Sequence, residues 1–341
     1  MENFSAERLE QISQVVLEAV GTPADLASIV GKALVTANLV GHDSHGVIRL
    51  PQYAGMVDQG QIVPTERAVI TRQTGAMAQV DGARGWGQPA AQLATRTAIK
   101  LARESGVGAV TLHRTNHVGR LGEYVEMMAR AGFIGIAFSN INPAVAAFGG
   151  KARLFGTNPI AFATPRGEGQ DPVLVDFATA GTAEGKLQIA KAKGEKIGPG
   201  LILDKDGNPS EDPLAFYDGG VLLPFGGHKG YGLSVMVELL GGALSGTAPS
   251  SLPEYTGGNG TLLIALNVDM FVPLTQFMTQ ADGLADNIKN TPKAPGVKEV
   301  LVPGEPEWNT QRDRKVNGIA LPPATWDAIQ RLAEKLRVVL P

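Results

Sequence analysis

Three polar segments around histidines can carry chemistry in this chain, which holds only five histidines in 341 residues. The first segment, His42–Arg49, reads HDSHGVIR and is followed closely by Tyr53. Histidine titrates near neutral pH, so His45 can exchange a proton with a carbonyl oxygen. Arg49 can bind a carboxylate through two parallel hydrogen bonds. If residues 45 onward are helical, His45 and Arg49 share one face, which predicts proton transfer on an acidic substrate.

Two other interpretations of the first segment stay open at this point. The segment can be the polar C-terminal end of a helix that is capped by its histidines. It can also be the metal site of a lyase or hydrolase, with these ligands: His42, Asp43, His45 and the distant His117. Neighbours this close seldom converge on one ion without a distant third ligand, so we expect no metal.

The second and third segments each open a predicted helix. Thr115–Gly122 follows a predicted strand, and its glycines allow a ligand to approach the backbone. Phe225–Gly232 reads FGGHKGYG, and its glycines and Lys229 indicate an anion cradle. Helix N-termini bind phosphate through free N–H groups and the helix dipole. The alternatives are a capped connection with a surface histidine and a flexible turn with a solvated lysine.

Other parts of the sequence are less specific. Small polar residues form three further stretches: Phe155–Pro159, Asp176–Ala180 and Ala183–Lys186. Such residues are common at ligand clefts and in plain turns. The sequence lacks G-x-G-x-x-G, a Walker A lysine, G-x-S-x-G and H-E-x-x-H. A bound nucleotide must therefore be held by loops of another kind.

The composition is that of an ordinary globular protein, with 43% apolar and 18% charged residues. The net charge of −3 shows no basic surplus of the kind that binds nucleic acids or anionic membranes. Cysteine is absent, which excludes disulfides and a cysteine nucleophile and fits a reducing compartment. The N-terminus is polar, and no apolar run approaches the roughly 20 residues of a membrane helix. We therefore expect a cytoplasmic protein without nucleic-acid or membrane partners.

Helices and strands must position these segments. Apolar periodicity predicts helices at 5–20, 22–41, 89–104, 119–131, 230–245 and 323–338. Thr22 is expected as the N-cap of the second helix and Pro23 as its first residue. Strands are expected at 107–112, 133–139, 159–164, 173–177 and 262–268, and loops near 191–213 and 291–306. Helices and strands mix without strict alternation, which predicts an α/β or α+β fold with a central sheet.

Taken together, the polar segments resemble those of the malate/L-lactate dehydrogenase family of the non-Rossmann type. This family includes ureidoglycolate and sulfolactate dehydrogenases, diketogulonate reductase and piperideine-2-carboxylate reductase. The matching stretches run in the family's order over nearly the whole chain: 41–53, 116–122, 155–165, 176–186, 226–232 and 295–308. Six linked motifs in order are more specific than any one of them.

The resemblance implies a fold, a cofactor and an assembly. The expected cofactor is NAD or NADP, bound by a non-Rossmann domain with a largely antiparallel central sheet. A helical domain built from both chain ends would flank it. The expected parts are an N-terminal helical part (1–75), a central NAD(P)-binding domain (76–285) and a C-terminal segment (286–341). The enzyme would be a homodimer with its active site in a cleft.

The resemblance also implies roles for individual residues. Ser44 and His45 match the family's catalytic pair, and His117 matches a histidine that transfers a proton or contacts the cofactor. The substrate side matches Arg49, Tyr53, Thr157 and Lys186. The cofactor side matches Val118, Gly119, Arg120 and Leu121 beside His117, then Asp176, Phe177 and Ala178, then His228, Lys229 and Gly230, then Pro303, Gly304 and Glu305. Whether His45 or His117 carries the proton stays open.

Lys186 departs from part of the family's pattern. Some relatives that reduce cyclic imines carry an acidic residue there, which joins their serine–histidine relay. A lysine cannot accept a proton from histidine in that way, but it adds a cation near a carboxylate. The sequence therefore favours interconversion of a small 2-hydroxy acid and its 2-oxo acid. Reduction of a cyclic 2-imino acid, and a ligand-binding relative without activity, are the alternatives.

Overall fold

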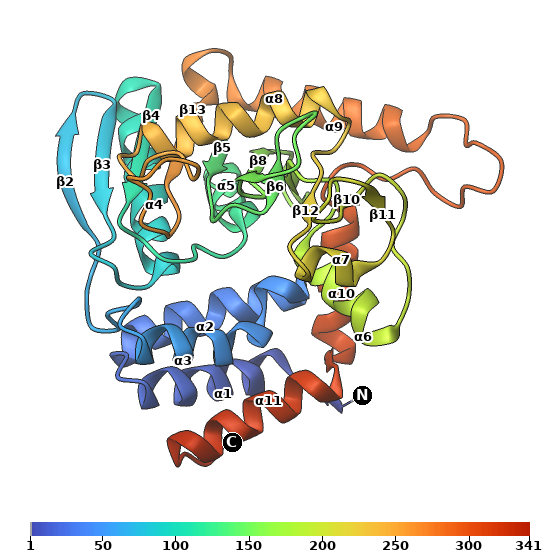
Figure 1. Ribbon diagram of the computed structural model, residues 1–341. Coiled ribbons are helices and arrows are strands. Elements are labelled where there is room, and N and C mark those ends of the chain that lie inside the picture. Colours follow the sequence, from blue (N-terminus) through green and yellow to red (C-terminus); the bar gives the residue numbers. More distant parts are fainter. Residues whose placement is uncertain (1) are drawn as a thin grey trace.

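A seven-stranded sheet runs through the upper half of the molecule in the computed structural model, which describes residues 2–341 (Figure 1). All neighbouring strands are antiparallel except β3 and β4, which are parallel. In spatial order the strands are β2 (Val69–Thr74), β3 (Met77–Asp81), β4 (Val107–His113), β13 (Thr261–Asn267), β5 (Phe133–Ser139), β8 (Pro159–Thr164) and β9 (Val173–Ala178).

Two helices cover one face of this sheet, α4 (Gly87–Ser105) and α5 (Leu121–Arg130). Buried and half-buried residues alternate along β4 and β5, because successive side chains point to opposite faces of a sheet. Gly108 lets α4 lie directly on β4, since a Cβ there would come within 2.1 Å of the Ala98 carbonyl oxygen. The core between these elements is therefore closely packed around small residues.

Helices from both ends of the chain form a second cluster below the sheet (Figure 1). They are α1 (Ala6–Ala19), α2 (Ala24–Leu39), α3 (Leu50–Asp58) and α11 (Pro323–Leu336). The short strands β1 (Glu2–Phe4) and β14 (Ile319–Leu321) pair antiparallel and tie the two ends together. Phe4 packs on Trp326 of α11 with ring centroids 4.7 Å apart.

A small five-stranded sheet lies beside the large one. Its order is β11 (Pro209–Ser210), β10 (Ile202–Leu203), β12 (Val221–Leu222), β6 (Val145–Ala146) and β7 (Arg153–Phe155). The helices α6 (Glu184–Lys193) and α7 (Pro213–Tyr217) pack against it. The predicted loop at 191–213 therefore contains two short strands, β10 and β11.

Three further helices complete the fold. α8 (His228–Val237) continues into a π-helical turn, η3 (Glu238–Ala243), and α8 and α9 (Leu274–Lys289) cross above the sheet (Figure 1). α10 (Glu305–Asn317) leads back toward the terminal helices. Within residues 2–341, no helix has both the length and the apolar character needed to cross a membrane.

Most predicted elements are confirmed, and three details are wrong. β5 and β8 have the predicted bounds. Pro23, not Thr22, occupies the N-cap of α2, and the buried Thr22 hydroxyl has no hydrogen-bond partner among the described residues. α5 begins at Leu121 rather than at 119. Residues 45–49 are not a continuous helix, because two 3-10 turns, η1 (Asp43–His45) and η2 (Val47–Arg49), are separated by an extended Gly46.

Candidate active site

Two histidines from distant parts of the chain meet between the terminal helices and the sheet. His45 ends η1, and His117 lies in the loop between β4 and α5. Their ring centroids are 5.3 Å apart. The Ser44 hydroxyl lies 3.0 Å from Nδ1 of His45. The structure therefore brings the three predicted catalytic residues together.

Tyr53 orients His117 through a hydrogen bond to its ring. Its hydroxyl lies 2.7 Å from Nδ1 of His117, and Nε2 of Gln88 donates to the same hydroxyl at 2.7 Å. Burial raises the pKa of Tyr53 to about 12, so its hydroxyl keeps its proton at neutral pH. Because the tyrosine oxygen accepts from Gln88, its proton points to His117, whose neutral ring then carries its own proton on Nε2.

Both imidazoles are neutral at pH 7 without a ligand. Burial, followed by the positive charges of Arg49, His42 and Arg120, lowers the pKa of His45 to about 3. Burial, followed by His45 and Arg49, lowers the pKa of His117 well below its ordinary value. A nearby anion would oppose these cations and favour the charged imidazole.

Arg49 reaches this site by a route that differs from the sequence prediction. It does not share a helix face with His45, because Gly46 interrupts the helix. A Cβ on Gly46 would lie 2.2 Å from the Asn38 amide oxygen, so only glycine fits where the backbone passes this close to α2. Nε of Arg49 instead donates to the Ser44 carbonyl at 2.6 Å, and Nη1 donates to Gln52 at 2.6 Å.

The other two predicted substrate residues lie on neighbouring elements. Lys186 is exposed in the first turn of α6, and a Cβ on the preceding Gly185 would lie 3.0 Å from Cβ of Ser44. Thr157 lies before β8, where its carbonyl accepts from the Thr179 backbone N–H at 2.8 Å. In the described part of the chain, no hydrogen bond joins Thr157 or Lys186 to either site histidine.

The first predicted cofactor segment meets Asp176 of β9. The Gly122 backbone N–H donates to Asp176 at 2.7 Å, and a Cβ on Gly122 would lie 2.3 Å from Nη1 of Arg120. The Arg120 side chain is only 2% exposed, with Nη2 3.5 Å from Glu126. None of its three guanidinium nitrogens has a hydrogen-bond partner among the described residues. Burial raises the pKa of Asp176, and the Arg120 cation opposes this shift.

The remaining cofactor segments also meet β9 or the residues just after it. Thr179 accepts from the Phe225 backbone N–H at 3.0 Å, and the Phe225 carbonyl accepts from Gly230 at 3.1 Å. The Pro303 carbonyl accepts from the Leu174 backbone N–H at 3.1 Å. Four predicted cofactor segments that are far apart in the sequence therefore meet along β9: 118–121, 176–178, 228–230 and 303–305. His228 and Lys229 are exposed at the start of α8.

Two of the four candidate metal ligands, His42 and Asp43, have charged partners of their own. His42 lies 3.5 Å from Glu307, and Asp43 holds Arg314 with its two oxygens at 2.7 and 3.1 Å. Throughout residues 2–341, no three His, Cys, Asp or Glu side chains are grouped so that they could hold a metal ion. The arrangement of these side chains thus does not favour the metal-site interpretation.

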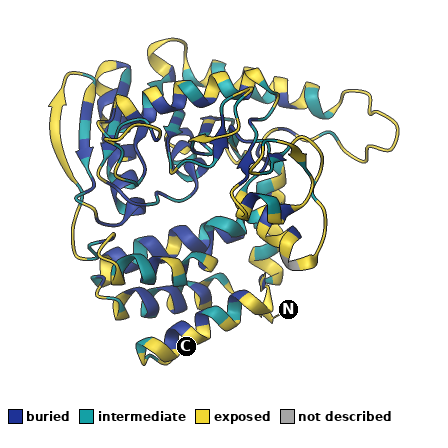
Figure 2. Ribbon diagram, viewed as in Figure 1, coloured by how far each residue is buried: buried dark blue, intermediate teal, exposed yellow. Residues whose placement is uncertain are grey.

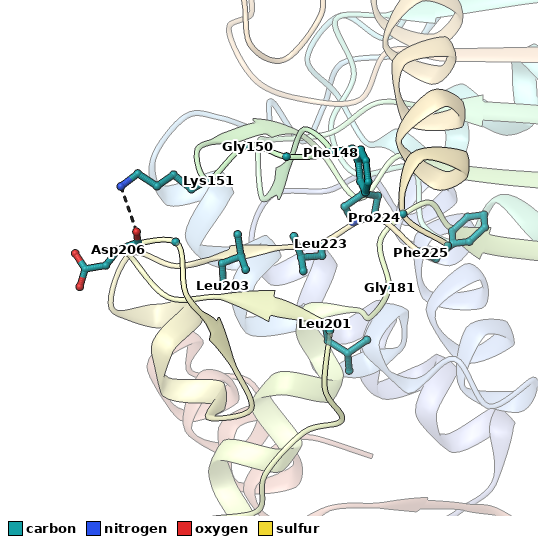
Figure 3. A pocket seen from close by; sticks show the side chains of 15 residues that line it. Phe148, Gly150, Lys151, Gly181, Leu201, Leu203, Asp206, Leu223, Pro224 and Phe225 are labelled. Atoms are coloured by element: carbon teal, nitrogen blue, oxygen red, sulfur yellow. Dashed lines mark hydrogen bonds between the residues drawn. The ribbon is translucent and has the colours of Figure 1, made fainter.

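A cavity of about 700 Å³ lies apart from the histidine pair, beside the small sheet (Figure 3). Its walls include Leu201, Leu203 and Leu223, and its rim carries Lys151 bound to the Asp206 carbonyl. It adjoins the glycine loop through Phe225. Sequence reasoning missed this cavity and also missed Gln88, whose contact with Tyr53 joins residues 35 positions apart.

Comparisons with known proteins agree with the resemblance. The profile of malate/L-lactate dehydrogenases matches residues 4–330. The chain is 37% identical over 346 residues to the L-lactate dehydrogenase of Cupriavidus necator, covering 99% of each. It is 38% identical over 326 residues to the L-sulfolactate dehydrogenase of Methanocaldococcus jannaschii, covering 94% of this chain and 93% of the relative.

A solved structure extends this likeness to three dimensions. The malate dehydrogenase from Entamoeba histolytica matches with a TM-score of 0.94 at 30% identity, covering 100% of this chain and 99% of the other. Sequence and fold therefore agree over the whole length of the chain. The chain belongs to the malate/L-lactate dehydrogenase family.

Proposed function

We propose that this protein is an NAD(P)-dependent oxidoreductase that interconverts a small 2-hydroxy acid and its 2-oxo acid. The observation that carries the proposal is the pair of histidines, His45 and His117, each bonded to a hydroxyl group and set beside Arg49. The named relatives are dehydrogenases of lactate, malate and sulfolactate, which are 2-hydroxy acids. Membership of their family supports the same reaction class here.

The residues along β9 fit a dinucleotide. Arg120 offers a buried guanidinium whose nitrogens have no hydrogen-bond partner in the described chain, and Lys229 adds a cation at the start of α8. Gly226 and Gly227 have φ of +56° and +61°, which permits a tight loop at this helix start. Helix starts of this kind bind phosphate groups. When bound, the nicotinamide supplies or accepts the hydride.

The chain's own residues would bind the acid and move a proton. Arg49, with Lys186, would hold the carboxylate, and Ser44 would orient His45. Burial is the main cause that keeps the imidazoles neutral, and the bound carboxylate would offset the cations that add to it, so a histidine could gain the proton that the substrate oxygen needs. Tyr53 and Gln88 fix the tautomer of His117 with its Nε2 proton available. In this tautomer Nε2–H of His117 can donate a hydrogen bond to the substrate oxygen, but neither ring nitrogen is free to accept a proton while Tyr53 donates to Nδ1. Replacing His45 and His117 one at a time and comparing kcat decides which ring carries the proton.

An absorbance screen at 340 nm tests this function. NADH and NADPH are each offered with pyruvate, oxaloacetate, other 2-oxo acids and piperideine-2-carboxylate. Oxidation of either cofactor with a 2-oxo acid supports the proposal. Turnover with the cyclic imine alone would assign the protein to imine reduction, and no turnover with any substrate would favour a ligand-binding relative.

We also propose that the protein is a cytoplasmic homodimer. The exposed face of α8 and η3 supports the dimer, because large apolar side chains gather there: Leu233, Met236, Leu239 and Leu244. Exposed apolar clusters of this kind mark protein contacts. Light scattering of the purified protein would give twice the mass of one chain, and the mass of a single chain would contradict the dimer. The absence of cysteine is compatible with the cytoplasm.

A further inference from the structure

A buried carboxylate that the proposed chemistry does not use lies where α8 passes into η3. Glu238 is 3% exposed. Its oxygens accept hydrogen bonds at 2.6–3.4 Å from the side chains of Asn140 and Asn158, from the Gly156 backbone, and from the Ser250 backbone and hydroxyl. None of these partners is a cation. A buried charge is costly unless it is fully hydrogen-bonded, so these neutral donors must stay in place.

The first branch of this network holds Thr157. Gly156 and Asn158 flank Thr157, and both donate to Oε1 of Glu238, at 3.4 and 2.9 Å. Asn158 adopts a left-handed φ of +42°, and its amide also donates to the Ser234 carbonyl at 3.2 Å. Hydrogen bonds to α8 and η3 therefore hold the backbone on each side of Thr157, the predicted substrate contact.

The same branch returns to the start of α8. The Thr157 carbonyl accepts from Thr179, the Thr179 carbonyl accepts from Phe225, and the Phe225 carbonyl accepts from Gly230. Gly230 lies in the first turn of α8, and Glu238 follows directly on its last residue. These bonds close a ring that fixes the glycine loop relative to Thr157 and the end of β9.

The second branch runs toward His117. Asn140 donates to Glu238 at 3.0 Å, and its carbonyl accepts from the Asn259 side chain at 2.9 Å. The Asn259 backbone N–H donates to the Thr115 carbonyl at 3.0 Å, two residues before His117. One carboxylate thus connects the loops of the predicted proton carrier, substrate contact and cofactor segment. Single π-helical turns of the η3 type occur frequently at functional sites.

We propose that Glu238 is a positioning residue that sets the His117, Thr157 and 225–230 loops at their working separations. This inference rests on the proposed function for the roles of those loops. In Glu238→Gln the side chain keeps its shape, but one oxygen acceptor becomes an amide NH2 group, a donor that faces other N–H or O–H donors. At least one of the loops must then shift.

Cofactor binding and local exchange test the proposal together. Glu238→Gln should raise the Kd for NADH or NADPH, titrated by fluorescence, about tenfold or more, because a hydrogen bond to a charged group is lost. Hydrogen–deuterium exchange should rise in peptides covering 115–117, 155–158 and 225–230. Ser250→Ala, outside the predicted site, removes the hydroxyl that donates to Glu238 at 2.6 Å and to the Leu154 carbonyl at 3.1 Å, and it should change both quantities in the same direction by less.

Leu332→Ala in α11 is the control for plain destabilisation, since Leu332 is buried among the terminal helices. It should lower Tm without changing cofactor Kd or exchange in the three loops. The proposal is overturned if Glu238→Gln and Ser250→Ala lower Tm as this control does but leave exchange in the loops at the wild-type level. If exchange rises while the wild-type protein binds neither cofactor, Glu238 positions the loops and the proposed function fails instead.

Discussion

In the proposed mechanism the protonation of His45 and His117 decides the chemistry, and the fold holds both rings neutral. The causes are physical and local, since burial comes first and neighbouring positive groups second. A neutral imidazole can take a proton from a hydroxy acid during oxidation at its unprotonated nitrogen, which in His117 already accepts from Tyr53. For reduction, the substrate's carboxylate must first offset the cations around the ring. The neutral imidazoles of the ligand-free site thus suit oxidation of the hydroxy acid, whereas the carboxylate of a bound oxo acid would favour the protonated imidazole that reduction needs.

The depressed pKa of His45 predicts acid sensitivity of the fold. In the unfolded chain this ring takes up a proton as pH falls through about 6.5, whereas the folded ring does so only near 3. Stability is therefore full above pH 6.5 and is lost as pH falls toward 3. In His45→Gln the slope of the unfolding free energy with pH should fall by about 1.4 kcal/mol per pH unit between about pH 4 and 6.

Urea unfolding of wild type and variant at several pH values measures this slope. His117→Gln should act in the same direction, since its pKa is also lowered well below the ordinary value. Equal slopes in the wild type and in both variants would show that neither ring is held neutral by the fold.

Arg49 provides the second prediction at this scale. Its Nε and Nη1 are bonded to Ser44 and Gln52, so the guanidinium is fixed in the loop that carries His45. Arg49→Lys keeps the charge but cannot make both bonds and also pair with a carboxylate. We expect kcat/KM for the acid to fall roughly ten- to a hundredfold, about 1.4–2.7 kcal/mol, with cofactor affinity unchanged.

Steady-state kinetics with separate cofactor binding measures this effect. Arg96→Lys, an exposed position on α4, is the matched control and should behave as wild type. If Arg49→Lys retains full kcat/KM, the carboxylate is held elsewhere, and Lys186 becomes the leading candidate.

Among the elements, the glycine loop before α8 yields a third prediction. Lys229 is exposed in the first turn of this helix, where a cation suits a phosphate. Lys229→Ala should raise the KM for the nicotinamide cofactor about ten- to a hundredfold, at a cost of about 1.5–3 kcal/mol, and affect the acid less. Lys100→Ala, exposed on α4, is the control. An unchanged cofactor KM in Lys229→Ala would remove this residue from the cofactor site.

Elements with a buried face could be predicted from the sequence, and elements without one could not. β5 alternates regularly between buried and half-buried residues, and its predicted bounds are confirmed. β2 is exposed along its whole length, so it shows no alternation to detect (Figure 2). α10 buries only Trp308 and carries no apolar stripe, so its helical period is invisible in the sequence. Apolar periodicity in the sequence reflects the burial of one face, and β2 and α10 bury few side chains.

The site could be predicted only where neighbours in sequence are neighbours in space. Ser44 and His45 are adjacent, and their contact needs no tertiary fold. The predicted helix through Arg49 is wrong, because Gly46 is extended where the chain passes so close to Asn38 of α2 that a Cβ would not fit. The direct hydrogen bonds of Glu238 join residues up to 98 positions apart, and no local pattern indicates them.

At the scale of the whole molecule, the C-terminal part of the chain holds the turn that carries the proposed catalytic residues Ser44 and His45. Arg314 of α10 bonds both oxygens of Asp43, which lies 271 residues earlier, and it also bonds the Asn38 carbonyl. The Asn38 side chain accepts from the Val47 backbone N–H at 2.9 Å and donates to Asp43 at 2.6 Å. These bonds enclose the turn that carries Ser44 and His45. The fold of the whole chain is therefore needed to place two adjacent residues.

Arg314→Ala should consequently damage catalysis more than stability. Its partner Asp43 is half exposed, so losing the ion pair should cost only about 1 kcal/mol of unfolding free energy. The freed turn should misplace His45 by enough to lower kcat roughly ten- to a hundredfold, because small displacements of a catalytic group are costly. Cofactor Kd should stay near wild type, since the segments along β9 make no contact with this ion pair among the bonds described above.

Arg312→Ala is the matched control on the same helix. Arg312 pairs with Asp171 at 2.7 Å and is more exposed than Arg314, but its partner lies away from the turn that carries Ser44 and His45. It should lose a similar or smaller amount of stability and keep its kcat, because nothing that it holds carries a catalytic residue. Equal kcat values for the two variants would mean that η1 keeps its shape without α10. A loss of kcat in Arg314→Ala alone would show that closure of the chain ends positions the histidine.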